Sequence, residues 1–160
     1  MAAVSPHAIS AFSGQIVMSL LEDITSKDPH RIWTSSCAIR ELRDIEELKY
    51  LASHLEEIKQ KTKGVFLGGA LRSNSTHLDY AIRKLDFVKT SQECLCRLYP
   101  LDDLYDPNRE LKAGNIRITG VVRIEGKWVD YYECECALCG QRFRVAERDY
   151  HYTWWAWRLA

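Results

Sequence analysis

The sequence predicts an α+β protein in which about three N-terminal helices pack on a C-terminal antiparallel sheet of four to five strands. Two observations carry this prediction. Through residues 1–90 apolar side chains recur every three to four positions, the period of a helix with one buried face. From about Gln92 onward they alternate with polar side chains, the period of a half-buried strand.

We expect one domain over residues 1–160, with a helical subregion over 1–90 and a β subregion over 91–160. The 22 Lys and Arg residues equal the 22 Asp and Glu residues, and neither half is basic, which disfavours a protein whose main task is to hold nucleic-acid backbone. No stretch of 18 apolar residues occurs, and no basic segment precedes the first apolar run. These features predict a cytoplasmic protein with no membrane partner.

The first helices are predicted from their start signals and apolar stripes. Ser5 followed by Pro6 is typical of a helix start, and apolar spacing continues a helix over about residues 6–25. Residues 28–33 are expected to be a connector. One long amphipathic helix should then cover residues 36–64, with leucines and isoleucines on one side and charged residues on the other.

A third helix is predicted after a glycine-rich segment, residues 64–75, which fits a short strand, a turn or a frayed hinge. Thr76 with Asp79 fits a capping box at the start of this helix. We expect the second and third helices to pack as an antiparallel pair.

The strands follow from period-two alternation and from the turn signals between them. A loop separates the first strand from the second, and residues 125–127 read as the hairpin turn between the second and the third. The predicted strands cover residues 93–99, 115–124, 127–136, 141–148 and 149–159.

Five of the six cysteines lie in two short clusters, which suggests a metal site. Cys136 and Cys139 sit three positions apart across a tight turn, where two thiolates can bind one tetrahedral Zn²⁺. Gly140 supplies the positive φ that such a turn needs. Cys94 and Cys96 alternate on a predicted strand, so their side chains should share one face.

The segment from Cys136 to Gly140 resembles the knuckle of zinc-ribbon proteins, which pair two such turns around one zinc. The first half departs from that pattern, because Cys94 and Cys96 are separated by one residue and no glycine follows. The prediction is one structural Zn²⁺ per chain. Its ligands are Cys94, Cys96, Cys136 and Cys139, with Cys134 as an alternative ligand or a residue behind the ligands.

Two other interpretations of the cysteines stay open. They are either buried small side chains of the sheet, as free cysteines often are, or a redox-active CxxC pair. The redox pair is disfavoured because such motifs open a helix, whereas strand-like residues follow Cys139.

Four thiolate ligands would fill every place on the metal, so the sequence predicts no enzyme. The leading hypothesis is a zinc-stabilised binding protein that acts on a protein partner, with a toxin-neutralising immunity-type inhibitor as one instance. The candidate partner-binding residues are aromatic side chains of the last strand, which exposed would be typical of binding hot spots. They are Tyr152, Trp154, Trp155 and Trp157. Burial of both faces of that strand is the alternative.

The second hypothesis is a regulatory nucleic-acid-binding zinc-ribbon protein, with Arg142, Arg144 and Arg148 as the contacting residues. Acidic neighbours at 133, 135, 147 and 149 favour salt-bridged strands instead. A third hypothesis is a zinc-dependent deaminase, because His54-Leu55-Glu56 and the CxxC imitate that signature. A solvated helix face accounts better for His54 and Glu56.

Overall fold

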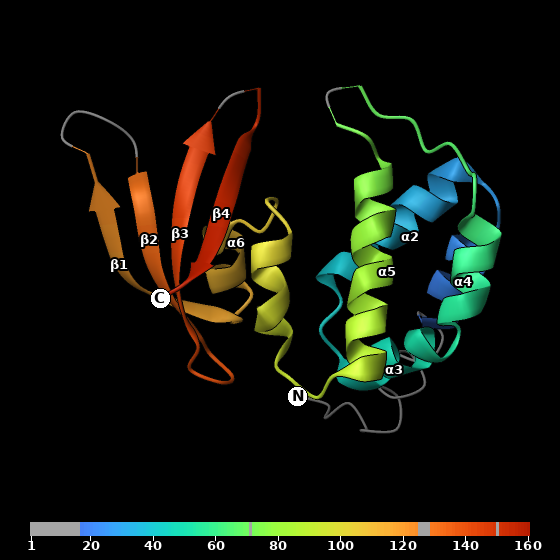
Figure 1. Ribbon diagram of the computed structural model, residues 1–160, viewed down its shortest axis with the longest axis horizontal. Helices are drawn as coiled ribbons and strands as arrows, with labels where there is room; N and C mark the ends of the chain where they lie inside the picture. Colours follow the sequence, from blue (N-terminus) through green and yellow to red (C-terminus); the bar gives the residue numbers. More distant parts are fainter. Residues whose placement is uncertain (1–16, 71, 125–128, 150) are drawn as a thin grey trace, which may run out of the picture. The chain divides into compact units, whose positions relative to one another are not determined.

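The chain forms two compact units, Met1–Gln92 and Glu93–Ala160, which divide where the apolar period changes (Figure 1). The computed structural model describes residues 17–70, 72–124, 129–149 and 151–160. Helices come first and a four-stranded antiparallel sheet follows, as predicted. The predicted helix start at Ser5 and the predicted hairpin turn at 125–127 lie outside the described residues. Within the described part of the chain, every helix is too short or too polar to span a membrane.

The first unit is a bundle of helices around an aliphatic core. It contains a helix over residues 17–24, then α2 (Pro29–Glu41), α3 (Ile45–Ser53), α4 (Leu55–Thr62) and α5 (Ser75–Thr90). Helix α5 packs against α2, α3 and α4. The fully buried apolar side chains come from all of these helices and include Ile24, Ile32, Ile39, Leu48, Leu51, Leu55, Ile58 and Leu85.

The predicted single helix over residues 36–64 is wrong, because three helices divide this segment. The backbone becomes extended at Leu42, where ψ is 130°, and α3 begins after Asp44, whose carboxylate accepts from the amides of Glu46 and Glu47. A buried cation caps the end of α2: Lys84 Nζ donates to the carbonyls of Arg40 at 2.7 Å and Leu42 at 2.5 Å. The apolar stripe continues across these breaks, so periodicity alone could not reveal them.

Two predicted boundaries also shift because local caps act differently. Residues 28–33 are not a connector, since Asp28 caps α2 through the amides of His30 and Arg31 and Pro29 occupies its first turn. The capping box predicted at Thr76 does not form. Helix α5 begins at Ser75, and Thr76 Oγ1 donates instead to the carbonyl of Ser73 at 2.8 Å.

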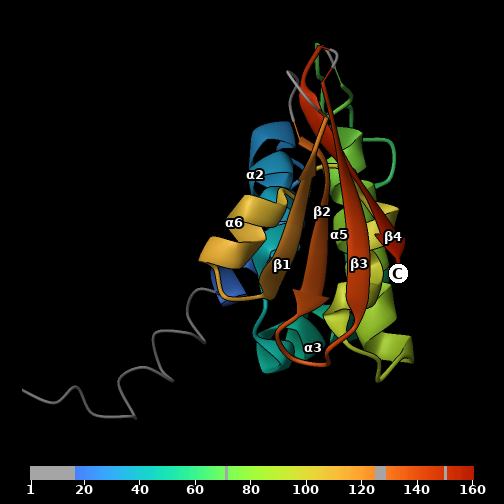
Figure 2. The same cartoon turned by 90° about the vertical axis from the view of Figure 1, so that its left-hand side faces the viewer.

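The second unit contains a 3₁₀ helix, a short α-helix and the sheet. The 3₁₀ helix η1 covers Leu95–Leu101 and α6 covers Pro107–Lys112. The strands are β1 (Ile116–Arg123), β2 (Val129–Cys136), β3 (Arg142–Asp149) and β4 (Thr153–Leu159). They lie side by side in the order β1-β2-β3-β4 with every pair antiparallel (Figure 2).

The strand predicted over residues 93–99 is wrong, because this segment opens η1. Leu98 and Tyr99 are adjacent and both buried, which strand alternation does not allow. Pro100 lies inside η1 and has no N–H to donate to a sheet ladder. The sheet therefore has four strands, and the first cysteine pair lies on a turn of helix.

One face of the sheet is closed by an aromatic core. The ring of Tyr99 in η1 stacks on Trp157 of β4 with centroids 4.3 Å apart, and the edge of Phe143 of β3 meets both rings. Trp157 Nε1 donates to the carbonyl of Tyr105 at 2.8 Å. From α6, Asn108 Nδ2 donates to the hydroxyl of Tyr132 on β2 at 3.2 Å. We call this side the inner face of the sheet.

Candidate metal centre

Two separate segments supply the cysteines of the candidate centre. Cys94 is the N-cap residue of η1, and Cys96 lies in its first turn, where the amide of Arg97 donates to the carbonyl of Cys94 at 3.0 Å. Cys94 is half-buried and Cys96 is buried. The tight 3₁₀ turn directs both side chains to the same side, as alternation along a predicted strand was expected to do.

The other two cysteines lie on the turn between β2 and β3. Cys136 is buried at the end of β2, and Cys139 is exposed three residues later. The amide of Gly140 donates to the carbonyl of Cys136 at 3.0 Å, and the amide of Cys136 donates to Gln141 at 2.8 Å. Gly140 has a φ of 74°, the left-handed conformation predicted for it.

The four side chains of Cys94, Cys96, Cys136 and Cys139 come together as predicted, with all Sγ atoms within 4.8 Å of one another. Cys94 Sγ lies 3.7 Å from Cys136 Sγ, and Cys96 Sγ lies 3.4 Å from Cys139 Sγ. A tetrahedron with metal–sulfur bonds of 2.3 Å has sulfur–sulfur edges of about 3.8 Å. These distances therefore fit four thiolates around one metal ion, and all are far longer than a disulfide bond.

A hydrogen-bonded network joins the two halves of the centre through a buried carboxylate. Tyr99, on the same 3₁₀ helix as Cys96, donates from its hydroxyl to Glu110 Oε2 at 2.6 Å. Asn115 Nδ2 donates to the same oxygen at 2.8 Å, and the carbonyl of Asn115 accepts from the amide of Ala137 at 3.0 Å. Because Ala137 lies between the knuckle cysteines, this network fixes the position of η1 relative to the knuckle.

In the absence of metal, burial favours the protonated form of the thiols of Cys94 and Cys96. Burial raises the pKa of Cys94 and, more strongly, that of Cys96. Burial also acts upward on Cys139, but hydrogen bonds from the backbone of Gln141 and from the thiols of Cys96, Cys136 and Cys94 outweigh it and lower its pKa. A metal ion must therefore displace protons from Cys94 and Cys96 when it binds.

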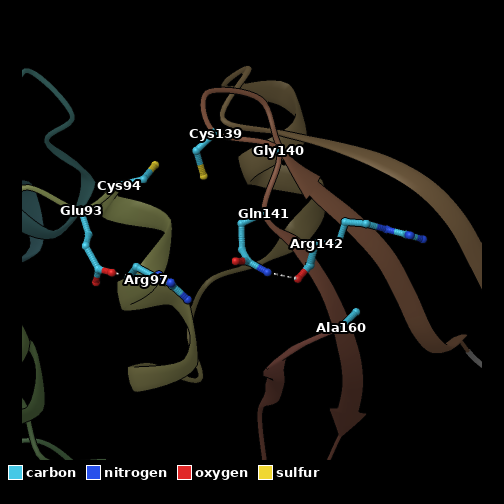
Figure 3. A pocket seen from close by; sticks show the side chains of 8 residues that line it. All are labelled: Glu93, Cys94, Arg97, Cys139, Gly140, Gln141, Arg142 and Ala160. Atoms are coloured by element: carbon cyan, nitrogen blue, oxygen red, sulfur yellow. Dashed lines mark hydrogen bonds and ion pairs between the residues drawn. The ribbon is translucent and has the colours of Figure 1, made fainter.

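One edge of the centre opens into a surface hollow of about 520 Å³ (Figure 3). The sulfurs of Cys94 and Cys139 point toward each other at its rim, and the side chains of Arg97 and Gln141 line it. Arg97 is 3.6 Å from the carboxylate of Glu93, so its charge is partly balanced. Two of the four cysteines, Cys94 and Cys139, therefore border solvent at this hollow.

Cys134 lies outside the cluster, which among the described residues consists of the four cysteines named above. It is 1% exposed and is paired in register with Ile118 on β1 and Phe143 on β3. Burial raises its pKa to about 12, so its thiol stays neutral. Cys134 is therefore an apolar residue of the inner face, and the structure does not place it as an alternative ligand.

The aromatic residues of β4 divide between core and surface. Trp157 is 4% exposed and belongs to the inner face, so its prediction as a partner-binding residue is wrong. Tyr152 is exposed, and Trp154 and Trp155 are half-buried, so their binding role stays a prediction. The register with β3 puts Trp154 on the opposite face from Trp157, and η1 covers the face that carries Trp157.

The residues of the deaminase-like pattern do not contribute to the cluster, whose four members are all cysteines. His54 ends α3, and its Nδ1 lies 3.4 Å from the carboxylate of Glu57 on the next helix. Glu56 pairs with Lys59 at 3.1 Å. Both residues belong to solvated helix surface, as the competing interpretation held.

Comparison with known proteins gives no family for this geometry: no family model matches the chain, and no curated protein and no solved structure matches it.

Sequence reasoning missed the residues that hold the centre and the caps in place. Glu110 lies in a segment expected to be a loop, and Asn115 lies at the start of a predicted strand. Lys84 lies in the predicted third helix, where no role was assigned to it. A Pro-x-x-Glu sequence after Asp106 signals the start of α6, but no local pattern shows that Glu110 receives a hydroxyl from Tyr99.

Proposed function

We propose that the protein is a zinc-stabilised binding protein whose metal centre has a structural role. The observation that carries this proposal is the convergence of four cysteine sulfurs within 4.8 Å. Thiolates select soft or borderline ions, and a tetrahedral set of four sulfurs is typical of Zn²⁺ and of iron. Hard cations such as Ca²⁺ and Mg²⁺ prefer oxygen ligands, which this cluster lacks.

A structural role is favoured over a catalytic one by the number of ligands. Catalytic zinc sites keep one position open for water or substrate, whereas four protein ligands complete the tetrahedron. The ligands also join η1 to the β2–β3 turn, so a bound metal would tie the covering layer of the unit to its sheet. The function then depends on a surface that this unit presents.

The experiment is metal analysis of the full chain with cobalt as a spectroscopic probe. We expect about one zinc per chain after mild purification, and a tetrahedral thiolate absorption spectrum when Co²⁺ replaces it. Cys139→Ser should weaken or abolish both signals. Cys134→Ser is the matched control, because Cys134 lies outside the cluster, and it should retain both. Folded wild-type protein without metal would refute the proposal, and iron in place of zinc would correct it.

A protein partner is the first candidate for the bound molecule, with a toxin held by an immunity-type inhibitor as one instance. Support comes from exposed apolar side chains of this unit, among them Leu138 at the tip of the knuckle, which is 85% exposed, and Tyr152. Co-purification of one protein that persists at high salt tests this candidate.

Single-stranded nucleic acid is the second candidate, and the charge distribution on the sheet favours it. The arginines that flank Phe143 were expected to be neutralised by the acidic residues beside them. Glu147 instead accepts a hydrogen bond from the hydroxyl of Tyr132 at 2.7 Å on the inner face. Of these three arginines, Arg148 alone forms an ion pair with a described residue, Asp130, at 3.4 Å.

A further inference from the structure

We propose that the outer face of the sheet, along β3 and β4, binds single-stranded nucleic acid. This inference deepens the second candidate function and rests on the proposed metal centre only because the sheet must be folded. The outer face is the side opposite Phe143 and Trp157. Strand alternation and register place five exposed arginines there: Arg117 on β1, Arg142, Arg144 and Arg148 on β3, and Arg158 on β4.

Two glutamates of β2 on the outer face are directed toward β1. Glu135 of β2 pairs with Arg117 of β1. Glu133 is turned the same way, since a Cβ added at Gly120 of β1 would lie 2.8 Å from Glu133 Oε2. Both glutamates therefore point away from β3, although they are the register partners of Arg142 and Arg144.

Three arginines besides Arg148 lie on the β3–β4 half of the outer face. Arg144 and Arg158 are directly opposite each other on paired strands, and Arg142 follows on the same side of β3. None of the three has an ion pair within 4.0 Å in the described part of the chain. Like charges directly opposite each other on a sheet are destabilising. A bound anion would reduce this repulsion, and phosphate is an anion that guanidinium groups bind in bidentate geometry.

Aromatic and small side chains lie beside these cations. The guanidinium of Arg144 lies 4.4 Å from the centroid of the Tyr131 ring. The next pair along the two strands is Ala146 with Ala156, and Trp154 follows opposite Arg148. The small alanine side chains project little from the sheet, between the Arg144–Arg158 pair and the Arg148–Trp154 pair. Bases of a single strand can stack on such rings and on guanidinium planes while the phosphates reach the arginines.

The shape and chemistry of this face favour a single strand over the other polyanions. The major groove of duplex DNA admits an α-helix or a two-stranded ribbon, and the face of a four-stranded sheet is broader than either. An acidic polypeptide would satisfy the arginines but has no bases to stack beside Tyr131 and Trp154. A flexible single strand can use both the charges and the rings.

The test is fluorescence anisotropy of the zinc-loaded full chain with labelled RNA and DNA single strands of roughly 12 nucleotides. We expect binding that weakens as salt increases, with a slope of about −2 in log affinity against log salt for roughly three phosphate contacts. A duplex of the same sequence should bind at least about tenfold more weakly.

Charge-matched variants localise the site. Arg144→Gln with Arg158→Gln should reduce affinity at least about tenfold and flatten the salt slope. Arg109→Gln with Lys112→Gln removes the same charge from α6, away from the outer face, and should leave affinity unchanged. Arg144→Lys keeps the charge but loses the planar group over Tyr131, so an intermediate loss is expected. Metal content and circular dichroism of each variant confirm that the unit remains folded.

Four results would overturn the inference: absence of binding at low salt, equal losses in the two double variants, equal affinity for polyglutamate, or a protein partner bound to this face at high salt. These outcomes are separate from failure of the proposed metal centre, which metal analysis of the same preparation detects on its own.

Discussion

The two units of the chain hold their folds by different means. The helical unit buries an aliphatic core to which five described helices contribute. This core is formed by side chains of the unit alone, without a metal ion. The β unit is shorter, and one layer of η1 and α6 covers its inner face. Small units with one thin core commonly need a metal or disulfides for stability. The four-cysteine centre sits where such support would join that layer to the sheet.

Buried polar groups sharpen this contrast. In the helical unit Lys84, 1% exposed, ends one helix by binding its last carbonyls. In the β unit Glu110, 4% exposed, joins η1 to the segment that leads into β1. Lys84 thus ends helix α2, whereas Glu110 holds together the two segments that carry the candidate metal ligands. Each unit should therefore respond to a different perturbation.

The largest effect is expected from loss of a buried ligand. Cys136→Ser should abolish stoichiometric metal binding and unfold the β unit, because structural zinc sites contribute on the order of 10 kcal/mol of apparent binding free energy. The helical unit should remain folded. Metal analysis and backbone amide NMR spectra measure both outcomes. Cys37→Ser in α2 is the control, since Cys37 lies outside the cluster.

Acidification should act in the same direction as this mutation. Burial raises the pKa of Cys94 and Cys96 above the ordinary value of 9.0, so in metal-free protein these thiols retain their protons through neutral pH. Metal binding releases those protons, and its affinity must rise with pH and fall as pH falls. The metal-bound β unit should therefore lose stability on acidification.

The buried thiol outside the cluster should act with the opposite sign. Burial raises the pKa of Cys134 from 9.0 to about 12, so its contribution to the stability of the folded, metal-bound protein is present below pH 9 and is lost as pH rises through about 12. Zinc release measured with a chromogenic chelator tests the acid direction, and unfolding of the zinc-loaded protein at alkaline pH tests the other. Tight zinc retention in strong acid would contradict the thiolate assignment.

A smaller effect, confined to the other unit, is expected for Lys84→Met. The change leaves the carbonyls of Arg40 and Leu42 without their buried donor, at a cost of about 2–4 kcal/mol in the free energy of unfolding. Metal content should not change. Urea unfolding measures the loss, and Lys89→Met on the exposed side of α5 provides the control. Equal effects of the two substitutions would show that Lys84 does not act as a cap.

The smallest effect is expected at the break between α2 and α3. Asp44→Ala removes the side-chain acceptor for the amides of Glu46 and Glu47 and should cost about 1 kcal/mol. Helical content in α3 should fall slightly, as followed by amide exchange of residues 45–48. A stability unchanged within error would mean that the apolar stripe alone fixes this boundary.

Much of the fold could be predicted because local patterns and tertiary structure agree. Alternation located β1, β2 and β3 to within a few residues, and the CxxC-Gly sequence located the knuckle. The strand prediction for residues 93–99 failed because Tyr99 packs on Trp157 from a 3₁₀ helix. This contact joins distant parts of the chain, so no local pattern reveals it. The helix break around Leu42 could not be predicted for a similar reason. Its freed carbonyl accepts a hydrogen bond from Lys84, 42 residues away in the sequence.

The clustering of the four cysteines was predicted correctly although part of the reasoning was wrong. A CxC pair can direct its two sulfurs to one point from a strand or from a 3₁₀ turn. The prediction that Cys94 and Cys96 share a site therefore holds, although they lie on η1 and not on a strand. Strand parity could not separate Cys134 from Cys136, because both face the inner side. Only the end of β2 at Cys136 places one sulfur at the cluster and leaves the other in the core.

The most direct test of the account is amide hydrogen exchange of the full chain before and after zinc is removed by a chelator. If the metal holds the β unit alone, protection should fall throughout residues 93–160 and remain in α2, α3 and α5. Restored zinc should restore the protection. Unchanged protection in β2 and β3 after complete metal removal would contradict the account.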